Sequence, residues 1–108
     1  MNTTIHKFVI PVQESFMMPG LHQELLQAKV EMPFGADILS VENQRETLTV
    51  WAMVNPEEKR MTQRKFALLA TGATLDRPVA AELQRDFAFM NTVLFSGGSF
   101  VLHVFKRV

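Results

Sequence analysis

The sequence predicts a mainly β (α+β) fold, an antiparallel sandwich or roll of six to seven strands with two short helices. The first indication is a C-terminal hairpin, because two runs rich in β-branched and aromatic residues, 87–95 and 100–105, flank Gly97-Gly98. Glycine adopts positive φ without a steric penalty, so paired glycines here favour a two-residue turn. The second indication is that residues 100–105 are apolar on both faces, which is typical of a strand covered on two sides. We therefore expect a central strand, or one that a partner subunit covers.

The N-terminal part predicts one strand and one short helix. Residues 4–12 alternate in polarity as a strand does, and Pro11 ends that strand or limits it to a sheet edge. Residues 21–29 then change to a helical period. Their apolar side chains fall on one stripe, which contains Leu21, Leu25 and Ala28. A helix this short is marginal alone, so we expect the stripe to dock, either as a lid on the sheet or on a partner protein.

The middle of the chain predicts a second hairpin, with strands at 38–41 and 47–54 joined by the polar tip 43–46. The inward face of the longer strand consists of Leu48, Val50, Ala52 and Val54. Trp51 lies on the opposite, less apolar face. In one interpretation Trp51 packs under a loop or helix, and in the other it stacks on a nucleotide base or anchors an interface.

The last third predicts one more strand and a second helix before the C-terminal hairpin. Residues 66–70 alternate as a strand and end at a Thr-Gly turn. Asp76 has the position of a helix N-cap, and Pro78 is tolerated in the first turn. Apolar residues then recur at every fourth position, at Val79, Leu83 and Phe87. This spacing indicates about two turns of helix.

Size and composition indicate one soluble domain. The chain has 108 residues, no cysteine, and 11 basic against 11 acidic side chains. This length suffices for a single core, so residues 1–108 are expected to form one β-rich domain. Zero formal net charge disfavours nucleic acid as a partner. No apolar run reaches the ~20 residues of a membrane span, so no membrane partner is expected.

No pattern of catalytic or metal-ligating residues stands out. The three histidines, His6, His22 and His103, lie on different predicted elements and lack the spacing of a metal site. No glycine-rich phosphate loop precedes a helix. We therefore expect no catalytic residue, no metal and no cofactor, and the protein is predicted not to be an enzyme.

Two sets of residues are candidates for binding. Arg60, Arg64 and Lys65 belong to the basic concentration of the chain and, with Trp51, would hold the phosphate and base of a nucleotide. In the alternative interpretation the basic residues form a solvated strand edge. The candidates for an oligomer or partner interface are Leu21, Leu25, Val101, His103 and Phe105. Surplus apolar surface of this kind often closes a homo-oligomer.

Six segments share their order with a known family: 7–13, 35–41, 48–56, 64–66, 70–72 and 97–105. This order resembles a family of small proteins of unknown function found in bacteriophages, prophages and their bacterial hosts. None of the segments is a catalytic motif. Relative to the family pattern, residues 15–29 form an insertion that carries the first predicted helix, and residues 75–86 form a longer, helical link.

The resemblance implies a non-enzymatic binding protein that acts stoichiometrically. Phage accessory proteins of this size cap a host protein, block a defence enzyme or sequester a small nucleotide signal. The expected partners are therefore a host or defence protein, or a small nucleotide, in the cytoplasm of the bacterial host cell. The alternative is a structural or assembly component of a virion, a role that a small, neutral, methionine-rich β domain suits equally well.

Overall fold

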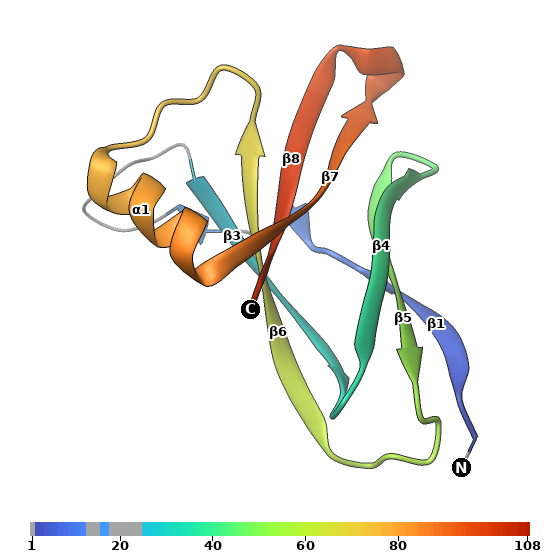
Figure 1. The fold of residues 1–108 in the computed structure, drawn as a ribbon. Helices are drawn as coiled ribbons and strands as arrows, with labels where there is room; N and C mark the ends of the chain where they lie inside the picture. Colours follow the sequence, from blue (N-terminus) through green and yellow to red (C-terminus); the bar gives the residue numbers. More distant parts are fainter. Residues whose placement is uncertain (1, 13–15, 18–24) are drawn as a thin grey trace.

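The computed structural model describes residues 2–12, 16–17 and 25–108 and has two antiparallel sheets (Figure 1). The smaller sheet has the order β1-β5-β4 and consists of β1 (Thr4–Val9), β4 (Asp37–Gln44) and β5 (Thr47–Val54). The larger sheet has the order β2-β3-β6-β8-β7 and consists of β2 (Phe16–Met17), β3 (Leu25–Pro33), β6 (Met61–Ala70), β7 (Phe87–Phe95) and β8 (Phe100–Arg107). One helix, α1 (Arg77–Asp86), lies beside the larger sheet. Within the described residues the predicted mainly β, antiparallel fold is confirmed.

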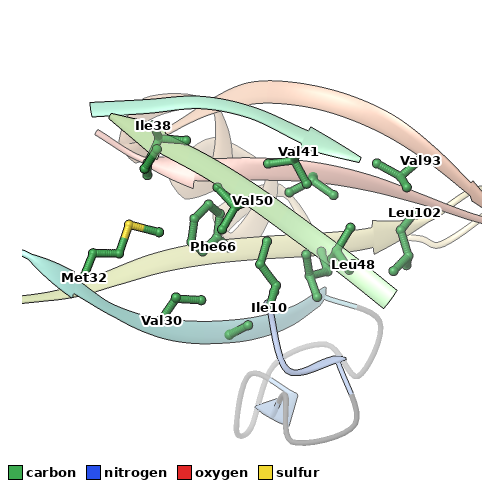
Figure 2. Packing of buried hydrophobic residues seen from close by; sticks show 14 of the residues in the cluster. Ile10, Val30, Met32, Ile38, Val41, Leu48, Val50, Phe66, Val93 and Leu102 are labelled. Atoms are coloured by element: carbon green, nitrogen blue, oxygen red, sulfur yellow. The ribbon is translucent and has the colours of Figure 1, made fainter. Parts of the chain in front are cut away.

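The main core lies between the two sheets and is formed by inward residues of β3, β4, β5, β6, β7 and β8, together with Ile10 and Ala36. In β5 the inward residues Leu48, Val50, Ala52 and Val54 are at most 2% exposed, which confirms the predicted inward face. Phe66 and Leu68 on β6 are fully buried in the same cluster. Figure 2 shows side chains of both sheets meeting in this layer. Burial of this apolar surface is the main favourable contribution to folding.

The helix predicted for residues 21–29 is wrong from Leu25 onward, because β3 begins there. Residues 21–24 lie outside the described part of the chain. β3 pairs with β6 along its whole length, from Leu25 opposite Leu69 to Pro33 opposite Met61. Leu25 and Ala28 therefore point to opposite sides of the sheet and belong to different apolar clusters. The ladder with β6, a distant segment, overrides the local helical pattern.

The C-terminal hairpin is present, and β8 lies between β6 and β7. The prediction of a central strand is therefore confirmed. The predicted two-residue turn is wrong, because Phe95 pairs with Phe100 and residues 96–99 connect the strands. A 3-10 turn over Ser96–Gly98 forms this connection, with φ of 69° at Gly97 and 98° at Gly98. The glycines thus supply the left-handed conformations that the longer loop requires.

The second predicted helix is confirmed as α1, which covers part of the outer side of the larger sheet. It follows the N-cap Asp76 and has Pro78 in its first turn, as the sequence indicates. Its inward residues Val79 and Leu83 join a separate buried cluster with Leu25, Ala67 and Phe87. Among the described residues α1 is the one α-helix. The inner face of the larger sheet packs on the core. Its outer face lies partly under α1, and no helix covers the rest of it.

Two asparagine side chains join β4 to β7, the edge strands that meet on one side of the two sheets. Asn91 donates from Nδ2 to the Val41 carbonyl at 2.8 Å, and Asn43 donates from Nδ2 to the Leu94 carbonyl at 2.9 Å. These bonds satisfy backbone carbonyls at a seam where no strand ladder forms between the two sheets. The seam holds β7 in place and so positions its outward side chains.

Candidate functional site

The outer side of β7 and β8 beyond α1 carries three rows of paired residues. Their register is Phe89 opposite Phe105, Thr92 opposite His103, and Leu94 opposite Val101. We call these six residues the outer β7–β8 face. Phe89 and Leu94 are 56% and 54% exposed, whereas Val101, His103 and Phe105 are half-buried. Three predicted interface residues therefore lie on the same side of the sheet, where Phe105 also packs against the cluster under α1.

His103 is fixed at the centre of this face by two threonine hydroxyls. Its Nε2 lies 2.7 Å from Thr71 Oγ1, and its Nδ1 lies 3.0 Å from Thr92 Oγ1. A hydroxyl either donates or accepts, so this arrangement satisfies both ring nitrogens in either tautomer. Beside it, the rings of Phe89 and Phe105 meet edge to face with centroids 5.5 Å apart. The centre of the face is therefore polar and held by hydrogen bonds, and the row beside it is aromatic.

The contact between Thr71 and His103 also brings a hydroxyl within reach of an imidazole, as in an activated nucleophile. Two features distinguish it from the usual geometry of an activated nucleophile. The group that orients His103 is the Thr92 hydroxyl and not a carboxylate. None of the three residues lines either cleft described below. The described residues also contain no group of three or more His, Asp or Glu side chains placed to hold a metal ion.

The outer side of the smaller sheet is also partly apolar, but charged or polar groups interrupt each of its rows. Register places Ile5, Met53 and Asp37 in one row, and Lys7, Trp51 and Ser40 in the next. The third row consists of Val9, Thr49 and Glu42. The outer β7–β8 face contains no Lys, Arg, Asp or Glu in its three rows. Depletion of charge at the centre is typical of protein interfaces, so the outer β7–β8 face is the better candidate.

Leu25, one of the two N-terminal interface candidates, does not join this face. Leu25 is 3% exposed and packs under α1 in the cluster of Ala67, Val79 and Leu83. Its burial within the chain leaves no surface for a partner. Leu21 lies outside the described residues. Phe89 and Leu94 were not predicted from the sequence, although they are the most exposed members of the face.

The four residues predicted to bind a nucleotide are not brought together. Trp51 is half-buried on the outer side of the smaller sheet, between Lys7 and Ser40. Arg60 lies in the loop after β5, where its guanidinium stacks on Phe34 at 4.4 Å from the ring centroid. Arg64 and Lys65 follow on β6. Trp51 and the basic residues therefore come from different sheets or loops.

An open groove does unite part of the basic cluster at the start of β6. It has a volume of about 460 Å³ and is lined by Thr62, Gln63, Arg64, Lys65, Arg107 and Val108. Arg64 uses Nη1 to donate to the Ala36 carbonyl at 2.7 Å, which fixes its guanidinium. The groove has the charge for an anion but no aromatic side chain for a base.

We expect Glu58 to titrate far below an ordinary glutamate because Arg60 binds it. The side-chain and backbone hydrogen bonds from Arg60 lower the pKa of Glu58 from 4.5 to about 2. Since the folded pKa is depressed, the stabilising contribution of this pair is present above pH 4.5 and is lost as the pH falls toward 2. Carbon-13 NMR of the Glu58 carboxyl in wild type and in Arg60→Gln will measure this. A midpoint that does not rise in the variant would contradict the assignment.

The fold and its open face define a small two-sheet β domain with one covering helix. The chain belongs to a domain family of unknown function (DUF7352), whose model matches residues 1–108. A search of curated proteins and a search of solved structures found no match. The expected membership in a family of unknown function is thus confirmed. No helix among the described residues is long and apolar enough to cross a membrane.

Proposed function

We propose that this protein is a non-catalytic binding protein that holds a protein partner on the outer β7–β8 face. The observation that carries the proposal is the exposure of Phe89 and Leu94 around a histidine whose two nitrogens are both hydrogen-bonded. Fully burying a phenylalanine or leucine side chain contributes about 1.5–3 kcal/mol relative to leaving it exposed. Because hydrogen bonds hold His103 and a ring contact orients Phe89, these two side chains would lose less conformational entropy on binding.

The identity of the partner class comes from the resemblance to phage and prophage proteins. We propose a host or defence protein in the bacterial cytoplasm, bound stoichiometrically. If the protein is a homo-oligomer, the partner on this face is a second copy of the chain. If it is a virion component, we expect open-ended self-association. Size-exclusion chromatography with light scattering distinguishes a defined complex from open-ended association.

The experiment is a pull-down with purified wild-type protein from a lysate of the bacterium that carries the gene, followed by mass spectrometry. We expect a partner that the variants Phe89→Ser and Leu94→Ser no longer retain, since both remove apolar contact area from the face. Ile5→Ser is the matched control, because Ile5 is 53% exposed on the smaller sheet. Purified partner is then titrated against each variant to confirm a direct complex.

Equal retention by all three variants would contradict the proposed face. Loss of retention in Ile5→Ser alone would place the interface on the smaller sheet instead. If the immobilised protein retained further copies of the same chain, and light scattering gave a defined oligomer mass, the partner would be a second copy of this chain. Each result depends on variants that remain folded, which thermal unfolding of the same samples establishes.

The nucleotide alternative now depends on the basic groove alone. Arg64, Lys65 and Arg107 supply positive charge there, but Trp51 lies on the other sheet. Calorimetry with a panel of cyclic nucleotides tests this version. Absence of heat across the panel would remove it without affecting the proposed protein interface.

A further inference from the structure

A second cleft opens between the sheets at the end opposite the basic groove. Its volume is about 330 Å³. The buried residues Ile10, Leu48 and Leu102 form its floor, and they can be followed in Figure 2. Val9 and Phe100 line it as well and are 57% and 45% exposed. The cleft is large enough for a small ligand, and its walls favour an apolar one.

Unusual backbone conformations concentrate at this cleft. Among the described residues the non-glycine positions with positive φ are Arg45, Glu46 and Ser96. Arg45 and Glu46 form a two-residue hairpin turn, because Gln44 pairs with Thr47. Such a turn normally contains Asn-Gly or Asp-Gly, which adopt positive φ at little cost. The Glu46 backbone N–H donates to Asn43 Oδ1 at 2.7 Å and so holds the turn, but glutamate is not a residue that this turn favours.

The Glu46 carboxylate joins this turn to the loop between β7 and β8 at the rim of the cleft. Its Oε1 accepts a hydrogen bond of 2.6 Å from the Ser96 backbone N–H. Its Oε2 accepts a bond of 2.7 Å from Asn43 Nδ2. The Asn43 side-chain bond and then the Ser96 backbone bond lower the pKa of Glu46, so the group is ionised at neutral pH.

The Glu46 carboxylate is fixed but retains acceptor capacity. Two carboxylate oxygens offer about four lone-pair directions, and three donors, the Ser96 N–H, the Ser96 hydroxyl at 3.4 Å and the Asn43 amide, occupy only part of them. Within the described residues no Lys, Arg or His forms an ion pair with Glu46. The cleft therefore combines apolar walls with one negative charge at its rim that has no ion-pair partner within the described part of the chain.

We propose that this cleft binds a small amphiphilic amine. Its aliphatic or aromatic part would lie on Ile10, Leu48 and Leu102, and its ammonium would donate to Glu46. The ring of Phe100, paired with Phe95 at a centroid distance of 6.0 Å, offers an aromatic surface to the apolar part. The negative rim excludes carboxylates of the same shape. This site shares no residue with the outer β7–β8 face.

The experiment compares three probes with the same arylethyl group: phenethylamine, 2-phenylethanol and 3-phenylpropionate. Each is titrated into nitrogen-15-labelled protein up to about 10 mM, a range that suits the weak affinity of so small a ligand. We expect the amine to shift the amide resonances of Glu46, Thr47, Ser96 and Leu102 most strongly, the alcohol less, and the acid least.

Glu46→Gln keeps the size of the side chain and removes its charge. We expect this variant to bind phenethylamine about tenfold more weakly while its affinity for 2-phenylethanol stays unchanged. Phe100→Ala provides a second variant, which should weaken both the amine and the alcohol because it removes apolar wall. The amide spectrum away from the cleft verifies that each variant is folded.

Three outcomes would overturn the proposal. The first is the absence of shifts with phenethylamine in wild type. The second is equal affinity for the amine, the alcohol and the acid, which would remove the role of Glu46. The third is a set of shifts centred on the outer β7–β8 face, which would place amine binding outside the cleft.

Discussion

Replacing Phe66 with alanine is expected to lower the free energy of unfolding by about 3–5 kcal/mol. Phe66 is 0% exposed and is the largest of the fully buried side chains between the sheets. It lies on β6, opposite Ala28 on one side and Lys106 on the other, so its neighbours belong to backbone ladders that cannot close the space it leaves. The cost therefore includes both lost apolar transfer and a residual cavity. Urea unfolding followed by Trp51 fluorescence measures the change.

Phe89→Ala is the matched control, since it makes the same chemical change on the outer β7–β8 face. Phe89 is 56% exposed and contacts the ring of Phe105 edge to face. We expect a loss below about 1.5 kcal/mol, mostly from that ring contact. If both alanine variants lost the same stability, the outer β7–β8 face would be part of the core, and the proposed interface would lose its main support.

The sequence determines the fold well where a strand has one period and one buried face. In β5 the inward positions Leu48, Val50, Ala52 and Val54 are apolar without a break, and the structure buries all of them. The start of α1 could be predicted equally well from the sequence, because Asp76 and Pro78 occupy positions where helices begin. These features depend on neighbours in the sequence, so local reasoning finds them.

Local reasoning failed where a distant strand decides the structure. The apolar residues from 21 to 28 are compatible with a helical period as well as with a strand. What selects the strand is β6, which begins at Met61 and supplies a ladder to the whole of β3. No pattern within residues 21–29 carries information about that pairing.

A bulge explains why the most exposed residues of the candidate site were missed. The register of β7 shifts between Phe89 and Asn91, so Phe89 and Leu94 lie on the same side although their numbers differ in parity. Strict alternation would place Leu94 on the opposite side from Phe89. Bulges redirect side chains in this way, and they are frequent near functional surfaces.

The cleft at Glu46 could not be read from the sequence for a different reason. Its lining comes from the end of β1, the turn before β5 and the loop after β7, which meet only in the folded chain. The residue types at positions 45 and 46 do not predict the positive φ of Arg45 and Glu46, because turns of this type favour neither arginine nor glutamate. A glutamate in a polar turn is ordinary until the Ser96 N–H is found 2.6 Å from its carboxylate.

Leu25→Glu is expected to destabilise the protein by several kcal/mol, because it buries a carboxylate under α1. Leu25 is 3% exposed in a cluster with Ala67, Val79 and Leu83, and none of these side chains offers a hydrogen bond or a positive charge. In the interpretation that docks the predicted helix on a partner protein, the same residue would have faced that partner, and its replacement would have reduced binding with little effect on stability. The two interpretations thus give opposite results for one substitution.

Leu94→Glu is the control for this experiment, since Leu94 is 54% exposed on the outer β7–β8 face. We expect its unfolding free energy to stay within about 0.5 kcal/mol of wild type, as is usual for surface substitutions. Its partner binding in the pull-down should be lost, because a charge then replaces one of the two most exposed apolar side chains of the face. Chemical unfolding and pull-down of the two glutamate variants therefore separate a core leucine from an interface leucine. A stable Leu25→Glu protein would show that α1 does not cover β3. A Leu94→Glu protein that still retained the partner would show that the interface lies away from β7 and β8.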